Sequence, residues 1–355
     1  MTLRTFRKDL AAIPTATVWS LTELGRAIGR QELFTKQSPQ KLKALAEHAL
    51  IESAVSSSRI EGVEVEQKRI GTLVFGKAAL RDRDEEEARG YRNALRLIHA
   101  EGGALPVTQE TIRELHRLAR GGVGNAGEYQ QKDGDIIERA ADGREEVRFR
   151  PTQAEETPAA MAELVELWTE GVREKWVPAL VAVAAFNLDF LCIHPFRDGN
   201  GRASRLLLLL QTYHAGAEVG RYISLERLIE QNKDRYYETL QQSSARWHEG
   251  KHNPWPFIDY VLWIQREAYK EFERRVEDIT TAPGAKGKVV LAAIGRMAGS
   301  FSIAQLQREC AGVSVDMLRH VLRAQRAEGR VKCLGRGRDA MWRRIGKGGN
   351  GNENG

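Results

Sequence analysis

The stretch HPFRDGNGRASR, residues 194–205, decides how the rest of this 355-residue chain is interpreted. Apolar residues recur at helical spacing over residues 177–193, before the stretch, and over residues 202–213, at its end. Five consecutive leucines at positions 206–210 indicate a helix that is buried on most sides. The sequence therefore predicts a short loop between two helices of the core.

This loop carries residue types that suit a phosphate. Glycines in residues 198–201 let the backbone turn sharply, and the loop leads into a helix N-terminus, where free amides and the helix dipole favour an anion. Asp198 lies beside that anion site and is well placed to hold Mg²⁺, because this cation prefers carboxylate and phosphate oxygens. Arg202 and Arg205 are three positions apart on one helix face, and their guanidinium groups suit phosphate oxygens.

His194 supplies the remaining role, because a histidine can accept a hydroxyl proton near neutral pH. Each residue alone has an ordinary structural explanation: a histidine before proline, a Gly-Asn-Gly turn, a solvated arginine pair. Their joint occurrence within twelve positions favours in-line attack of an alcohol on a metal-bound nucleotide phosphate.

The stretch resembles the Fic family motif H-x-F-x-[D/E]-G-N-G-R-x-x-R. All eight fixed positions match: His194, Phe196, Asp198, Gly199, Asn200, Gly201, Arg202 and Arg205. The resemblance extends over about residues 40–265. It implies a mainly α fold, a helical Fic core with a β-hairpin flap, and transfer of AMP from ATP to a Ser, Thr or Tyr hydroxyl of a target protein.

The resemblance also implies the role of each motif residue. His194 is the base, Asp198 the Mg²⁺ ligand and Phe196 the anchor of the loop. Gly199, Asn200 and Gly201 hold the phosphates, and Arg202 and Arg205 bind the distal ones.

Turn signals and an alternating pattern over residues 127–151 predict a β-hairpin. Its residues Val147, Arg148 and Phe149 resemble the flap that aligns a target segment by strand addition. Residues Asn232, Tyr236 and Tyr237 resemble the helix that lines the nucleoside pocket, although aromatic helix packing is an equal explanation for Tyr236. Two positions depart from related sequences, which often have Asn at 244 and His at 187; this chain has Ser244 and Asn187.

A second pattern predicts a built-in brake. Ser57, Glu61 and Gly62 fit the family's inhibitory pattern [S/T]-x-x-x-[E]-[G/N], and Ser57 and Glu61 share one helix face. Glu61 is expected to pair with Arg205 and block the γ-phosphate. A charge-assisted pair is worth roughly 1.5–3 kcal/mol, a bias of about ten- to hundred-fold. The alternative is a helix end at Gly62 with an ordinary surface glutamate.

The last fifth of the chain is a separate basic unit. Residues 284–355 hold 14 Lys and Arg against 5 Asp and Glu, a net charge of +9, whereas the chain as a whole carries +6. Helices near residues 288–297, 302–310 and 314–327, followed by a basic hairpin at 330–344, predict a winged helix-turn-helix. Arg319, Arg323 and Arg326, with Arg336 and Arg338 in the wing, suit DNA phosphates; protein docking or dimerisation is the competing hypothesis.

The expected domains are an N-terminal helical region (1–75), the Fic core (76–280), the winged helix (281–345) and a disordered tail (346–355). The sequence has no stretch of about 18 apolar residues and no apolar leader, so we expect a cytoplasmic protein without a membrane partner. Cys192, Cys310 and Cys333 fit reduced thiols.

Several functions remain open from the sequence. The first is an autoinhibited adenylyltransferase that uses ATP and Mg²⁺. Its target protein is unknown, and the chain itself is one candidate. The alternatives are a DNA-binding regulator whose Fic core is a sensor, and a Fic enzyme that removes AMP or transfers another nucleotide. A homodimer is compatible with each.

Overall fold

A computed structural model describes residues 1–9, 12–35, 39–62, 83–122, 124–139, 145–281, 285–297, 299–310, 313–335 and 340–345. Its contacts divide the chain into two compact units. The first consists of Met1–Gln31 and Lys43–Phe272, and the second of Glu32–Leu42 and Glu273–Gly355. No described helix is long and apolar enough to cross a membrane.

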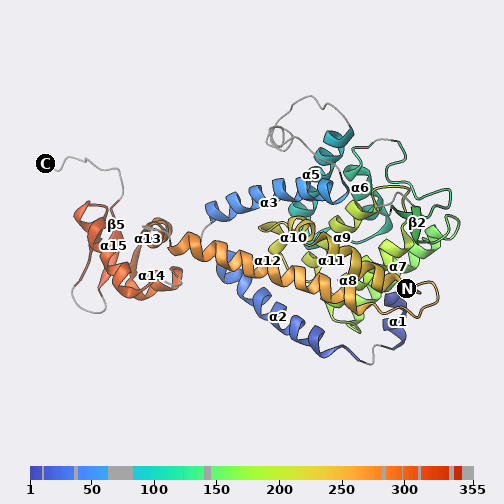
Figure 1. Cartoon of the computed structure of the whole chain (residues 1–355). Helices are drawn as coiled ribbons and strands as arrows, with labels where there is room; N and C mark the ends of the chain where they lie inside the picture. Colours follow the sequence, from blue (N-terminus) through green and yellow to red (C-terminus); the bar gives the residue numbers. More distant parts are fainter. Residues whose placement is uncertain are drawn as a thin grey trace. The chain divides into compact units, whose positions relative to one another are not determined.

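Most of the chain up to residue 281 is helical (Figure 1). The α-helices are α1 (Thr2–Lys8), α2 (Thr15–Thr35), α3 (Pro39–Ile60), α5 (Arg83–Glu101), α6 (Gln109–Ala119), α7 (Thr157–Glu174), α8 (Ala179–Ile193), α9 (Asn200–His214), α10 (Leu225–Gln231), α11 (Lys233–Ser244) and α12 (Trp255–Thr281). Two 3₁₀ turns, η1 (Gly102–Ala104) and η2 (Val219–Arg221), connect them. The strands are β1 (Ile136–Arg139) and β2 (Glu145–Phe149).

Helix α8 lies at the centre of the first unit. Every residue from 180 to 193 is buried, and α8 packs against α1, α7 and α9. Asn187 is the polar link between α8 and α9: its amide donates to Gln211 Oε1 at 2.9 Å and its Oδ1 accepts from Ser204 Oγ at 3.0 Å. The departure at position 187 therefore serves packing, and it fixes the pair of helices that flank the loop at 194–199.

The β-hairpin is present where the sequence predicts it. Strands β1 and β2 are antiparallel, and Ile137 pairs with Val147 across the hairpin. Both side chains are about half exposed, so this pair presents apolar surface to solvent. The turn predicted at residues 142–143 lies outside the described residues.

The second unit has helices α13 (Ala285–Arg296), α14 (Ile303–Glu309) and α15 (Val315–Ala327) and strands β3 (Ser300–Ser302), β4 (Val331–Cys333) and β5 (Met341–Arg344). The sheet has the antiparallel order β3-β5-β4. Ser302 and Ser314 cap α14 and α15. The three helices and the pair β4–β5 match the expected elements, while β3 was not predicted. Residues 336–339, with Arg336 and Arg338, and the tail at 346–355 lie outside the described residues.

A buried carboxylate fastens the start of the chain to the core. Asp189 of α8 accepts the Thr2 and Leu3 amides at 2.6 and 3.0 Å and the Trp247 indole N–H at 2.6 Å. The two amides are at the N-terminus of α1, where no intrahelical acceptor exists. Asp189 therefore caps α1 and ties it to both α8 and the segment before α12.

We expect Asp189→Ala to lower the free energy of unfolding by about 3 kcal/mol or more, because each buried donor that loses its acceptor costs about 1–3 kcal/mol. Urea denaturation measures the change. Glu163→Ala is the matched control, since it removes the exposed ion pair that Arg4 makes with α7 and is expected to cost at most about 1 kcal/mol. Equal effects of the two variants would contradict this role of Asp189.

Candidate active site

The site begins where α8 ends. His194 adopts φ 53°, ψ 57°, a left-handed conformation that is uncommon for a residue with a side chain. Its amide still donates to the Phe190 carbonyl at 2.9 Å, so the helix closes on the histidine itself. Conformations of this kind cost about 1–3 kcal/mol and concentrate at functional sites. The turn ends the helix and places the imidazole on the border of two cavities.

Phe196 anchors the loop, as expected. Its side chain is fully buried and its ring stacks on His116, with the centroids 3.7 Å apart. The Asn200 side chain bonds the Phe196 backbone twice, accepting from its N–H at 3.0 Å and donating to its carbonyl at 2.6 Å. The Asn200 side chain therefore shapes the loop and is not turned toward a phosphate, because both ends of its amide are already used.

His116 on α6 is a site residue that no sequence pattern predicted. Its Nδ1 accepts the Gly127 amide at 2.9 Å, so Nε2 carries the proton and donates to the Asp198 carbonyl at 2.8 Å. Burial lowers the pKa of His116 to about 4, which keeps the ring neutral. His116 therefore supports the loop through both a ring contact and a hydrogen bond.

Gly199 permits the close approach of the loop to α6. Its φ is +81°, and a Cβ there would lie 2.9 Å from Arg120 Cδ and 3.1 Å from His116 Nε2. Helix α9 begins at the next residue, and its first amides have no intrahelical acceptor. The loop thus presents a helix N-terminus with the geometry of an anion site.

A cavity of about 310 Å³ lies next to this helix N-terminus. It is lined by Glu61, Ile136, Arg148, Phe149, Leu191, Cys192, His194, Gly201, Arg205, Tyr236, Tyr237, Leu240 and Ser244. The structure thus brings together residues that are far apart in the sequence, from α3, the hairpin, α8, α9 and α11. Its apolar half suits a purine, and its polar half contains Arg205 and His194.

Helix α11 contributes its two tyrosines in different ways. Tyr236 is 5% exposed and packs between Tyr237, Phe257 and Tyr260, so packing and cavity lining coincide there. Arg148 Nη2 donates to the Tyr237 carbonyl at 2.9 Å, and its guanidinium lies 4.9 Å from the Tyr237 ring centroid. These contacts join the hairpin to α11.

Several of the expected residues do not line this cavity: Val147, Asp198, Gly199, Asn200, Arg202 and Asn232. Asn232 lies between α10 and α11, and its side-chain amide donates to the Leu228 carbonyl at 2.9 Å, which holds it at the helix junction. Val147 is 50% exposed, whereas its neighbours Arg148 and Phe149 both line the cavity. Ser244, at the second departure from related sequences, does line the cavity.

Glu61, the residue that follows α3, closes the side of the 310 Å³ cavity that contains Arg205. Arg205 is 3% exposed, and its Nη2 donates to Glu61 Oε1 at 2.8 Å and to Ser57 Oγ at 3.0 Å; its Nε also reaches Ser57 Oγ at 3.1 Å. Burial lowers the pKa of Arg205, but Glu61, Tyr91 and Tyr236 together outweigh burial and the pKa is raised. The Glu61 carboxylate also lies so close to Gly201 that a side chain there would collide with it. Gly62, at φ +82°, ends the helix.

The motif's acid is held by guanidinium groups. Asp198 Oδ2 accepts from Arg120 at 2.7 Å and from Arg83 at 3.3 Å. Although burial raises the pKa of Asp198, Arg120 and Arg202 outweigh burial and lower it, so the group is ionised. Among the described residues, no group of three or more His, Cys, Asp or Glu is arranged so that it could hold a metal ion. A single carboxylate fits Mg²⁺ that takes its other ligands from phosphates and water, but it would not hold a metal by itself.

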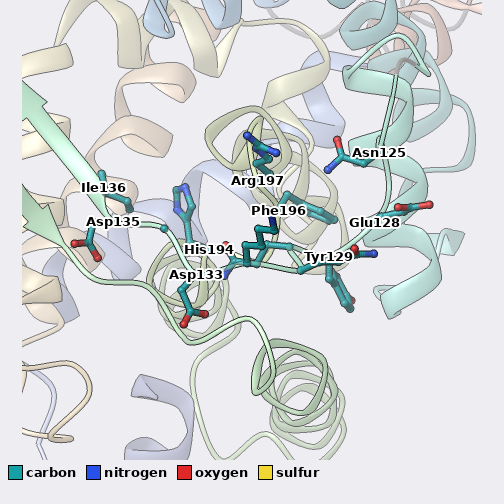
Figure 2. A pocket seen from close by; sticks show the side chains of 13 residues that line it. Asn125, Glu128, Tyr129, Asp133, Asp135, Ile136, His194, Phe196 and Arg197 are labelled. Atoms are coloured by element: carbon teal, nitrogen blue, oxygen red, sulfur yellow. The ribbon is translucent and has the colours of Figure 1, made fainter.

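A second cavity of about 540 Å³ meets the first at His194 and Ile136. Figure 2 shows Asp133 and Asp135 on the same side of Phe196 as His194, with Tyr129 and Glu128 on the other side. His194 therefore borders both cavities, the one with Arg205 and this polar one.

The protonation of His194 follows from its contacts. Its Nδ1 lies 3.3 Å from the Leu191 carbonyl, which can only accept, so Nδ1 carries the proton and Nε2 holds the free electron pair. Burial lowers the pKa of His194 below the ordinary 6.5, while the Leu191 carbonyl, Glu61 and Asp198 oppose the shift. His194 is thus neutral at pH 7 and able to accept a proton.

Residues 106–212 match a family model described as the Fic/DOC family. This part of the chain is similar to Fic domains. Fic domains generally transfer nucleotide-derived groups to proteins. The match includes α6, the hairpin, α8 and α9, hence the whole loop and its His116 support. No curated protein matches the chain.

Solved Fic structures share the fold. A Fic family protein from Desulfovibrio desulfuricans G20 is 22% identical with a TM-score of 0.61, over 96% of this chain and 98% of that one. A Fic domain containing signaling protein from Bacteroides thetaiotaomicron VPI-5482 is 21% identical with a TM-score of 0.58, over 72% and 98%. Fic-1 (aa134–508) from C. elegans is 17% identical with a TM-score of 0.58, over 73% of each chain.

We expect Asn200→Ala to lower the free energy of unfolding by about 2 kcal/mol, because it removes two hydrogen bonds from the buried Phe196 backbone at about 1 kcal/mol each. Urea unfolding of the full chain measures it. Asn125→Ala, an exposed position on the second cavity, is the control and is expected to stay within about 0.5 kcal/mol of the parent. An Asn200→Ala chain as stable as the parent would show that the loop does not depend on these bonds.

Proposed function

We propose that the chain is an autoinhibited protein adenylyltransferase, which transfers AMP from ATP to a hydroxyl side chain of a target protein. The observation that carries this proposal is the convergence of three groups on one cavity: neutral His194, the N-terminus of α9 and the buried Arg205. The cavity volume and its mixed apolar and cationic lining suit a nucleotide.

The transfer follows from this arrangement. The target's hydroxyl oxygen forms a bond to the α-phosphorus of ATP, and the bond from that phosphorus to the bridging oxygen of pyrophosphate breaks. His194 Nε2 takes the hydroxyl proton, and pyrophosphate leaves with the bonding electrons. The α9 amides and Arg205 neutralise the phosphates, which is the larger part of catalysis in such reactions. Asp198 would hold magnesium, which when bound adds further neutralisation of phosphate charge.

The hairpin supports the choice of a protein as acceptor. Its strand β2 contributes Arg148 and Phe149 to the cavity, and the polar second cavity continues on the far side of His194. A peptide segment added beside the hairpin would bring a side-chain hydroxyl to the imidazole between the two cavities.

Glu61 acts as the brake in this proposal. It holds the Nη2 of Arg205 that a γ-phosphate would need, and its negative charge repels phosphate from the same space. Its side chain is 30% exposed and follows directly on the end of α3, so it can leave without dismantling the core.

We expect Glu61→Gly to raise transfer from labelled ATP by about ten- to hundred-fold, the value of one charge-assisted pair. The assay is incorporation of label into the chain itself or into added proteins, checked by intact mass for the addition of AMP. Glu52→Gly, on the same helix but paired with Arg227, is the matched control and should leave the rate near that of the parent. Adding His194→Ala to Glu61→Gly should reduce transfer by about 10²–10⁴-fold. No gain with Glu61→Gly would remove the brake, and full activity without His194 would remove the base.

The pH dependence follows from the depressed pKa of His194. Because only the neutral ring accepts a proton, the rate of Glu61→Gly at saturating ATP should stay level from pH 8 down to the ordinary histidine value of 6.5 and fall only below it. Losing Glu61 also removes one influence that raises this pKa, which shifts the fall to still lower pH. An acid limb centred above pH 7 would contradict this role for His194.

A second function, DNA binding, is favoured by the surface of the C-terminal unit. Arg319, Arg323 and Arg326 are exposed on one face of α15, while Leu318 and Leu322 are buried on the other. Lys332, Arg343 and Arg344 on β4 and β5 are exposed as well. We propose that this unit, as a winged helix, contacts the phosphates of duplex DNA.

This second proposal predicts that the full chain binds duplex DNA with an affinity that falls steeply with salt. With three to five phosphate contacts, a plot of log K against log salt should have a slope of about −3 to −5. Changing Arg319, Arg323 and Arg326 to Glu should abolish binding, whereas Arg246→Glu, an exposed change in the first unit, should not. Absence of binding at low salt would overturn the proposal.

A further inference from the structure

Glu87 on α5 occupies an unusual position for a carboxylate. Its side chain is 6% exposed and contacts three guanidinium groups. Oε1 accepts from Arg83 Nε at 2.9 Å and from Arg120 Nη1 at 2.6 Å, and Oε2 accepts from Arg202 Nη1. A buried charge of this kind persists only where its partners compensate it, and their loss typically costs several kcal/mol.

The contacts continue from Glu87 to the metal-ligand position. The same Nη1 of Arg120 that binds Glu87 also donates to Asp198 Oδ2 at 2.7 Å, and the Arg120 side chain is only 10% exposed. Asp198 Oδ1 is fixed from the other side by the Gly199 amide at 2.6 Å. Glu87 is therefore connected to both ends of the expected phosphate site, directly to Arg202 and through Arg120 to Asp198.

The two motif arginines differ in which part of the guanidinium is held. Arg205 is bound by Ser57 and Glu61 through Nε and Nη2. Arg202 is bound by Glu87 through Nη1, and its Nε is buried with no hydrogen-bond partner among the described residues. The Nε–H of Arg202 is therefore without a partner among the described residues, whereas the Nε–H of Arg205 donates to Ser57.

We propose that Glu87 is a positioning residue of the phosphate site: it holds Arg202 directly, and it holds Asp198 through Arg120. This rests on the proposed nucleotide transfer. Glu87 and Glu61 each bind one motif arginine, but we expect opposite effects: Glu87 supports phosphate binding, whereas Glu61 blocks it. Glu61 is partly exposed and can leave, whereas Glu87 is buried beneath three cations and stays.

The test uses the Glu61→Gly chain as parent, so that the brake does not mask the effect. Glu87→Gln keeps the size of the side chain and removes its charge. It should raise the KM for ATP and the Mg²⁺ concentration for half-maximal rate, each by about ten- to hundred-fold, the value of one charge-assisted contact, with a smaller change in kcat. Glu87→Asp keeps the charge and should recover part of both values.

Glu271→Gln is the matched control. Glu271 forms an ion pair of 2.6 Å with Arg227, at 13% exposure of its side chain, away from the cavities. It should leave the KM and the Mg²⁺ requirement unchanged even if it lowers stability. A purely structural Glu87 would behave like this control.

The outcomes separate the inference from the function on which it rests. If the parent transfers and Glu87→Gln has an unchanged KM and Mg²⁺ requirement, or a higher rate, the positioning role is overturned. If Glu87→Gln does not fold by circular dichroism, Arg120→Lys replaces it, and an unchanged Mg²⁺ requirement there overturns the role. If the parent does not transfer at all, the proposed function fails, and calorimetric titration of both chains with ATP still decides whether Glu87 supports phosphate binding.

Discussion

The site depends on one constraint, the sharp connection between the buried helices α8 and α9. Both helices are fixed by the core, and Asn187 joins them with two polar contacts. Phe196 is fully buried and its ring contacts His116 and Phe190, which ties the loop to the core. The left-handed His194 and Gly199 are the backbone positions that make this short path possible. Packing of the core thereby positions His194, Asp198 and the N-terminus of α9.

Charge around this loop is arranged in two layers. The loop and α9 contribute cationic and dipolar groups around the cavity. These groups would repel one another without the negative charge of nearby carboxylates. Glu87 compensates them from the protein side, where water is excluded, and Glu61 compensates Arg205 from the cavity side. In the proposed function a phosphate replaces only the second of these carboxylates. The two carboxylates differ in burial, since the Glu87 side chain is 6% exposed and that of Glu61 is 30% exposed.

The sequence predicted the elements that depend on local pattern. The helices flanking residues 194–205, the hairpin and the Ser314 cap of α15 follow from periodicity, turn residues and capping. A helical region was expected over residues 1–75, but α1 was not delimited within it, because α1 is stabilised by Asp189, 187 residues away from Thr2, which no local pattern reveals. Strand β3 is only three residues long and is defined by its pairing with β5. The Glu61–Arg205 contact was predicted because Ser57, Glu61 and Gly62 have the spacing of the family's inhibitory pattern.

Other site residues could not be found in this way. Glu87 lies on α5, His116 lies on α6 and Arg120 is the residue that ends α6. Their roles arise from tertiary contacts, of His116 and Arg120 with Asp198 and of Glu87 with Arg120. His116 and Arg120 are four positions apart, a spacing that places two residues on one side of a helix end. Asn200 matched the motif, yet its side chain supports the loop, because a motif records which residue is present and not which way it faces. Asn232 is held at a helix junction for a similar reason.

The most direct test of the account is a crystal structure of the Glu61→Gly chain with ATP and Mg²⁺. It should place the terminal phosphates within hydrogen-bond distance of Arg205 and of the first amides of α9, with the α-phosphorus facing the cavity border at His194. Arg202 should still contact Glu87 through Nη1. Phosphates bound elsewhere, with Arg205 and the loop at 198–201 free of nucleotide, would contradict the central claim.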